Sequence, residues 1–150
     1  GYGVGPKDVV AAMTRLQSHS TSGASCIAQW AAVSALNDPK SPYFLTQRKD
    51  IFQKRRDLLV QGLQDIMTVT SPEGAFYVYA DVTALMAKKG CATDLMLGEK
   101  MLEQAWVSGV PGTEFGLPGY MRFSYATSMD ILLKAIARLQ SWAKGHEIVE

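Results

Sequence analysis

An arginine inside an alternating apolar run is the first feature of this sequence that could do chemistry. The run GYMRFSYA covers residues 119–126 and predicts a strand with two unlike faces. One face carries large apolar side chains and the other carries Arg122 beside small ones: Met121, Phe123 and Tyr125 against Ser124 and Ala126. A planar, permanently charged guanidinium suits a carboxylate. From the pattern alone, the simpler interpretation is a charge that protects an exposed edge strand from aggregation.

Three helices are expected in the first part of the chain, at residues 6–19, 26–38 and 41–66. A short strand is expected before them at GYGVG, residues 1–5, which starts without a lead-in and suggests a fragment of a longer protein. Arg48 and Arg55 fall within the apolar stripe of the third helix. We expect them to have a packing role, such as tying two lobes together, because buried guanidinium groups need water or a partner.

Strands and helices alternate in the second part, residues 69–144, and predict a compact two-layer α/β lobe. Pro72 and Gly74 interrupt a strand that continues with alternating side chains: Phe76, Val78 and Ala80 against Tyr77 and Tyr79. A helix is expected at about residues 93–105, and a last helix opens at Thr127.

Composition excludes several classes of function. The chain has 150 residues, 19% of them charged, and a formal net charge of +1, so neither nucleic acid nor a membrane is expected as a principal partner. Cys26 and Cys91 lack the spacing of a metal site or a disulfide framework, and we expect two small buried thiols. No stretch of about 18 apolar residues occurs, and a cytoplasmic location is the default expectation.

Four phrases in the right order resemble the C-terminal part of a class I pyridoxal-phosphate aminotransferase. They are GYGVGP at the start, PEGAFYVYADV from Pro72, VPGTEFG from Val110, and MRFSYA followed by the closing helix LLKAIARL. The segment TSGASCIAQWAAVSAL is similar in particular to bacterial aspartate aminotransferases and their aromatic-accepting relatives. The resemblance implies an α/β chain of fold type I. Residues 1–58 would end the large coenzyme-binding domain and include the long interdomain helix, and residues 59–150 would form the small C-terminal α/β domain.

The resemblance also implies roles for four residues. Arg122 matches the arginine that forms a forked ion pair with the α-carboxylate of the amino-acid substrate. Phe76 matches an aromatic residue that faces the coenzyme and the substrate, although a core phenylalanine fits its strand pattern equally well. Thr21 and Ser22 match a turn that approaches the active site of the other subunit of a homodimer.

The implied reaction is a ping-pong, Schiff-base transfer of an amino group between an amino acid, aspartate or similar, and a 2-oxo acid. The lysine that holds pyridoxal 5'-phosphate in this family precedes the matching segment, so we assign no catalytic, coenzyme-binding or metal-binding residue here. We expect this chain to need the remaining N-terminal part of the same protein, and to be inactive alone.

Two alternatives stay open. A carbon-sulfur lyase could use the same scaffold and the same carboxylate-binding arginine. A transcription regulator could instead use an aminotransferase-like domain as a non-enzymatic effector domain, and a DNA-binding domain upstream would indicate it.

Overall fold

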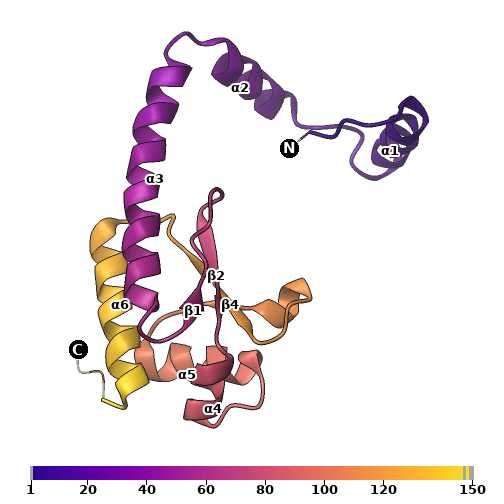
Figure 1. The fold of residues 1–150 in the computed structure, drawn as a ribbon. Helices are drawn as coiled ribbons and strands as arrows, with labels where there is room; N and C mark the ends of the chain where they lie inside the picture. The colour runs from indigo at the N-terminus through magenta and orange to yellow at the C-terminus, as the bar shows by residue number, and fades with distance from the viewer. Residues whose placement is uncertain (1, 147, 149–150) are drawn as a thin grey trace. The chain divides into compact units, whose positions relative to one another are not determined.

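The structure is a computed structural model that describes residues 2–146 and 148 (Figure 1). The chain divides into two compact units, residues 1–46 and residues 47–150. The expected assignment of residues 1–58 and 59–150 to a large and a small domain stays a prediction.

The first unit contains two short helices and the start of a third: α1 (Lys7–Ser20), α2 (Cys26–Asn37) and α3 (Ser41–Leu63). The helices predicted at residues 6–19 and 26–38 are therefore confirmed. The strand predicted at residues 1–5 is wrong for the described residues 2–5, which have no neighbouring strand to bond with. No described residue of α1 or α2 is buried. The expectation of a buried thiol fails at Cys26, which is exposed because these helices enclose no core, and Cys91 is buried.

The second unit is built on a four-stranded antiparallel sheet with strand order β1-β2-β4-β3. Its elements after α3 are, in chain order, β1 (Thr68–Val69), β2 (Tyr77–Asp81), α4 (Thr83–Lys89), α5 (Asp94–Ala105), β3 (Val110–Pro111), the 3-10 helix η1 (Gly112–Phe115), β4 (Tyr120–Ser124) and α6 (Met129–Lys144). The predicted α/β lobe is thus confirmed, although α4, η1 and β3 had no clear sequence signal.

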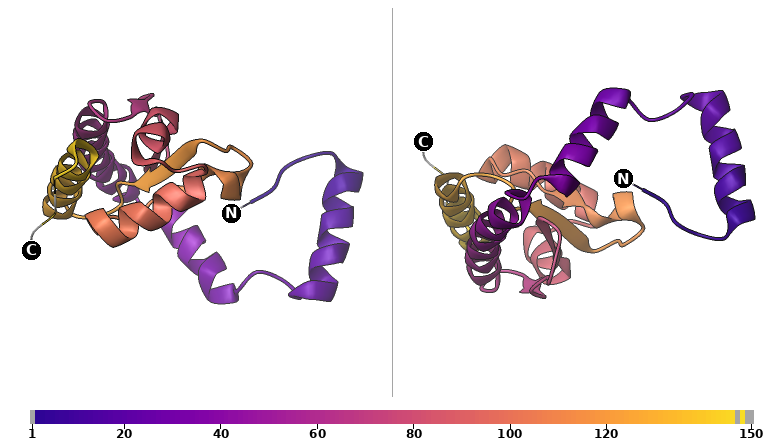
Figure 2. Two further views of the ribbon diagram at one scale, coloured as in Figure 1. Left: turned by 90° about the horizontal axis from the view of Figure 1, so that it is seen from below. Right: turned by 90° about the horizontal axis from the view of Figure 1, so that it is seen from above.

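One face of the sheet forms the hydrophobic core with α3, α5 and α6. Val78, Ala80, Met121 and Phe123 point into it and are between 0% and 4% exposed. Helices α3 and α6 lie side by side in all three views (Figures 1 and 2). Their contact is close at Gly62, where an added Cβ would lie 2.5 Å from Cγ2 of Ile136. A glycine is therefore required at this helix crossing.

Side-chain N-caps fix the first turns of α5 and α6. The hydroxyl of Thr93 accepts a hydrogen bond from the Met96 amide at 3.2 Å, as expected for the start of α5. The cap of α6 is Ser128 rather than Thr127, because the Ser128 hydroxyl accepts from the Ile131 amide at 3.4 Å.

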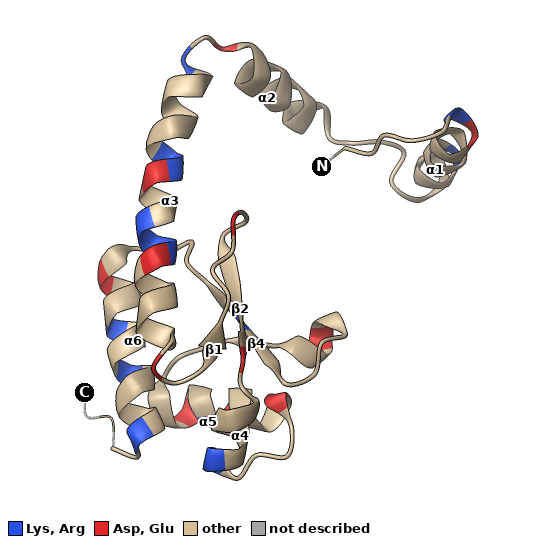
Figure 3. Ribbon diagram, viewed as in Figure 1, with Lys and Arg blue, Asp and Glu red and all other residues tan. Residues whose placement is uncertain are grey.

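Charged residues of both signs alternate along α3 (Figure 3). The guanidinium of Arg55 lies 5.6 Å from the ring of Phe52 in the same helix, and the role expected for Arg48 and Arg55 in tying two lobes together stays a prediction. Arg56 forms an ion pair with Asp57, with Nη2 and Oδ1 2.7 Å apart. None of the described helices combines the length and the apolarity needed to cross a bilayer.

Candidate functional site: the open face of the sheet

The face of the sheet opposite the core carries aromatic and polar side chains, and we call it the open face. It presents Tyr77, Tyr79 and Asp81 from β2 with Tyr120, Arg122 and Ser124 from β4, all of them partly or largely exposed. This division follows from strand alternation, since the residues between them are the buried ones. The two faces predicted for residues 121–125 are confirmed.

Arg122 lies in the interior of the sheet. Strand β4 has β2 on one side and β3 on the other, so that Arg122 pairs with Tyr79 across one ladder and with Val110 across the other. The interpretation as an edge-strand charge is therefore wrong. A charge that protects an edge has no purpose on a strand whose backbone groups are bonded on both sides.

Two aromatic rings hold the guanidinium of Arg122. Its Cζ atom lies 4.3 Å from the centroid of Phe115 and 5.2 Å from that of Tyr77. No aspartate or glutamate among residues 2–146 forms an ion pair with it. The carboxylate of Asp81, on the same face, accepts hydrogen bonds from the amide and hydroxyl of Thr83 at 2.9 and 2.6 Å. The hydrogen bond from the Thr83 hydroxyl has the larger effect in lowering the pKa of Asp81, and the hydrogen bond from the Thr83 amide lowers it as well.

Four rings form a continuous row along the open face, which we call the aromatic row: Phe76, Tyr77, Tyr79 and Phe115. Successive centroids are 5.5, 6.0 and 6.1 Å apart, and each pair meets edge to face. Two rings of the row, Tyr77 and Phe115, contact the guanidinium of Arg122. Such a surface can bind a planar or apolar group whose carboxylate reaches Arg122.

Phe76 stands at one end of this row and is 53% exposed. The interpretation as a core phenylalanine is therefore wrong. Phe76 lies just before β2, which begins at Tyr77, and it follows Ala75, whose positive φ of 63° turns the chain.

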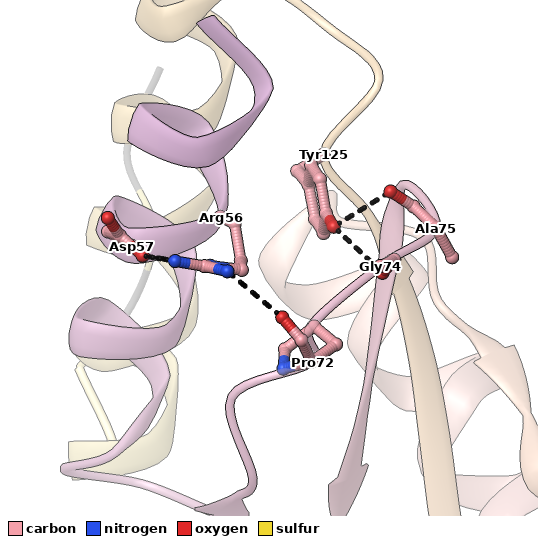
Figure 4. A network of polar contacts seen from close by, with 6 residues as sticks. All are labelled: Arg56, Asp57, Pro72, Gly74, Ala75 and Tyr125. Carbon is pink, nitrogen blue, oxygen red and sulfur yellow. Dashed lines mark hydrogen bonds and ion pairs between the residues drawn. The ribbon is translucent and has the colours of Figure 1, made fainter. Parts of the chain in front are cut away.

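The turn that carries Phe76 is fixed by two side chains (Figure 4). The hydroxyl of Tyr125 donates to the carbonyls of Ala75 and Gly74 at 3.0 and 3.4 Å. From α3, the guanidinium of Arg56 donates to the carbonyl of Pro72 at 3.1 Å. Burial raises the pKa of Tyr125, against a smaller opposite effect of Arg56, which extends the pH range over which its hydroxyl is protonated.

Thr21 and Ser22 lie in the first unit, in the turn after α1. The amide of Thr21 donates to the carbonyl of Gln17 at 2.9 Å, and Ser22 has a positive φ of 63°. Their relation to a second subunit stays a prediction. Sequence reasoning missed the part that Phe115 plays, because a phenylalanine in a Gly/Pro-rich connection has no periodicity that assigns it to a face.

Comparison with known proteins identifies the family. A family model described as "Aminotransferase class I and II" matches residues 1–139. Aspartate aminotransferase of Geobacillus stearothermophilus is 41% identical over 148 residues, which are 97% of this chain and 37% of that protein. A probable aspartate/prephenate aminotransferase of Aquifex aeolicus is 40% identical over 93% of this chain and 36% of its own length.

Solved structures agree with this match. Aspartate aminotransferase from Thermus thermophilus with maleate superposes with a TM-score of 0.78 at 39% identity, over 90% of this chain and 34% of that one. The aromatic aminotransferase from Pyrococcus horikoshii OT3 gives 0.80 at 30% identity, over 93% of this chain and 37% of that one. The chain thus spans about a third of the length of these proteins, and it belongs to the class I and II aminotransferase family.

Proposed function

We propose that this chain supplies the substrate-carboxylate site of a pyridoxal-phosphate-dependent aminotransferase. In it, Arg122 binds the α-carboxylate of an amino-acid donor, aspartate or a similar one, and of the 2-oxo acid acceptor. The observation that carries the proposal is a guanidinium held between Tyr77 and Phe115 with no carboxylate partner among the described residues. A partly buried charge of this kind is unusual unless a ligand completes it.

Two hydrogen bonds from Arg122, one to each oxygen of the carboxylate, would fix the substrate in one orientation. Arginine offers parallel N–H groups that match the two oxygens, and its charge does not depend on pH in the accessible range. The contacts with the Tyr77 and Phe115 rings restrict the motion of the guanidinium, which lowers the entropic cost of binding. The chain's contribution to catalysis is therefore positioning.

Phe76 is proposed to contact the coenzyme and the substrate. Its exposed fraction of 53% leaves the ring available to a ligand, and the row of rings connects it to Arg122. A flat apolar surface at this distance from a carboxylate-binding group suits the planar conjugated system on which this chemistry depends.

The family implies pyridoxal 5'-phosphate, which supplies the electron sink for amino-group transfer when it is bound. The open face does not fit this coenzyme by itself, since the side chains that it presents include no lysine. Lys89 and Lys100 are engaged elsewhere, because Lys89 donates to the carbonyl of Trp142 and Lys100 to that of Lys89. The residues of this chain fit a substrate carboxylate, and the coenzyme site is expected in the rest of the protein.

A homodimer with shared active sites is part of the proposal, and Thr21 and Ser22 would approach the partner's site. Support comes from the positive φ of Ser22, because strained non-glycine residues are concentrated at functional sites. A cytoplasmic location also stays a prediction.

The test is a conservative substitution in the full-length, coenzyme-loaded protein. Arg122→Lys keeps the charge and removes the fork, and we expect the KM for aspartate to rise about 10- to 100-fold, from the strength of hydrogen bonds to charged groups. Arg138→Lys is the matched control, because Arg138 also lies on a ring, 5.0 Å from the Trp106 centroid, but outside the aromatic row. An unchanged KM in Arg122→Lys would overturn the proposal.

The same preparation separates the proposed reaction from its alternatives. Formation of glutamate from aspartate and 2-oxoglutarate indicates a transferase. Release of pyruvate and ammonia from a sulfur-containing amino acid would indicate a carbon-sulfur lyase instead. Binding of the amino acid without turnover would favour an effector domain.

A further inference from the structure

Asp94 is the buried charged residue of the core, with an exposed fraction of 1%. Its Oδ2 accepts a hydrogen bond from the amide of Thr113 at 2.9 Å, and its Oδ1 accepts from the hydroxyl of Thr113 at 2.7 Å. The amide of Leu95 donates to Oδ1 as well, at 3.0 Å. No lysine or arginine among the described residues forms an ion pair with Asp94. The buried carboxylate therefore accepts two hydrogen bonds from a single threonine, besides the bond from Leu95.

These bonds are not needed to cap α5. That helix already has a cap, because the hydroxyl of Thr93 accepts from the amide of Met96 at 3.2 Å. Asp94 instead joins the start of α5 to η1, which is 19 residues further along the chain. The hydrogen bonds between Asp94 and Thr113 thus hold the η1 turn in place and do not cap the helix.

The η1 turn ends in the ring that lies on Arg122. Phe115 follows Thr113 by two residues, and its ring centroid is 4.3 Å from Cζ of Arg122. The other end of the turn is equally confined, since a Cβ on Gly112 would lie 2.2 Å from the carbonyl oxygen of Leu117. Both ends of η1 are therefore fixed, and Phe115 has little freedom to move away from the guanidinium.

We infer that Asp94 is a positioning residue for the carboxylate-binding site, which acts through Thr113 and Phe115 to set the orientation of the Arg122 guanidinium. This inference rests on the proposed function of Arg122. Each step from Asp94 to Arg122 is a direct contact. Two hydrogen bonds join Asp94 to Thr113, the four-residue turn η1 contains both Thr113 and Phe115, and a cation–π contact joins Phe115 to Arg122. A forked ion pair tolerates only a small misorientation of its donor, so a looser turn weakens carboxylate binding.

The test measures the dissociation constant of maleate, an unreactive dicarboxylate, in the full-length coenzyme-loaded protein. Thr113→Val removes the hydroxyl at constant shape, and we expect maleate to bind about three- to tenfold more weakly. Thr113→Ser restores the hydroxyl and should restore affinity to within about twofold. Thr93→Ala is the control, because it weakens the α5 cap without touching Thr113, and it should lower stability while affinity is unchanged.

A double-mutant cycle decides whether the effect runs through Phe115. In a Phe115→Leu background, Thr113→Val should have no further effect on maleate binding. Additive effects, or unchanged affinity in both Thr113→Val and Asp94→Asn, would overturn the inference. Failure of the proposed function itself is distinct, because Arg122→Lys would then leave maleate affinity unchanged.

Discussion

Two turns bring a phenylalanine to opposite ends of the aromatic row, and they are held in different ways. The turn of residues 72–76 ends in Phe76, and the hydroxyl of Tyr125 and the guanidinium of Arg56 hold it through main-chain carbonyls. The turn of residues 112–115 ends in Phe115, and a buried carboxylate holds it through Thr113. The open face is therefore framed by one turn whose carbonyls accept from a tyrosine and an arginine, and by one turn that is tied to a buried carboxylate.

The difference indicates which end of the row is rigid. The Phe115 turn is tied to a buried carboxylate, and a buried carboxylate left without donors is costly. The turn at Gly112 is also sterically closed, whereas a Cβ at Gly74 in the other turn would meet no atom within 4 Å. We infer that the Phe115 end is fixed and that the Phe76 end is the more adaptable.

The largest expected difference between the turns is in the effect of an added methyl group. Gly112→Ala should destabilise the protein by about 3 kcal/mol, because its Cβ would overlap backbone atoms that cannot move aside. Gly74→Ala is the matched substitution and should change stability by less than about 1 kcal/mol. Urea unfolding of both variants measures this. Equal losses would mean that the two turns are equally confined.

Replacement of the Asp94 carboxylate comes next in size. Asp94→Asn removes the charge while the shape is kept, and we expect a loss of about 2 kcal/mol near pH 7, because the bonds from Thr113 lose their ionic acceptor. The free energy of unfolding in urea measures the loss. A loss no larger than that of a neutral hydrogen bond would remove the contrast between the turns.

The pH dependence of that loss follows from the pKa of Asp94. Burial raises this pKa, but the hydrogen bonds from Thr113, Leu95 and Gly119 together outweigh burial and hold it below the ordinary value of 3.8. A carboxyl with a lowered pKa in the folded state stabilises the protein above its unfolded pKa, and this stabilisation is lost as the pH falls through the folded value. The difference between the wild type and Asp94→Asn should therefore be full near pH 7 and shrink below about pH 4. A constant difference would contradict it.

Loss of the Tyr125 hydrogen bonds, with the Arg56 bond left in place, should have the smallest effect. Tyr125→Phe removes the hydroxyl that bonds to Ala75 and Gly74, and we expect a loss of about 1 kcal/mol. Tyr120→Phe is the control, since the described residues provide no hydrogen-bond partner for the Tyr120 hydroxyl, and it should be nearly neutral. Urea unfolding again gives the values, and a Tyr125→Phe loss above that of Asp94→Asn would reverse the expected order of the two turns.

Much of the fold could be predicted from local patterns. Alternation along residues 121–125 gave the two faces of β4, and helical periodicity gave α3, α5 and α6 with ends close to those observed. Four phrases in the right order, one of them around Arg122, identified the family, which the match over residues 1–139 bears out. These features depend on neighbours in sequence, and a single sequence contains that information.

Other features could not be predicted because they depend on contacts between distant segments. The central place of β4 requires knowledge that β3 pairs with it, and β3 is only two residues long. Phe76 was ambiguous because the alternation of its strand does not include the turn at Ala75. The Asp94 pattern also fits an ordinary acidic residue in the first turn of a helix, which usually faces water.

The sequence by itself therefore determined the family, the apolar and polar faces of the Arg122 strand, and the residue that is proposed to bind a carboxylate. Only the tertiary structure decided that two rings enclose this guanidinium and that a buried carboxylate fixes the turn that carries one of them. The physical reason is the separation in sequence of the residues that interact. Side-chain alternation is a property of adjacent residues, whereas the bonds between Asp94 and Thr113 form only when α5 and η1 pack together.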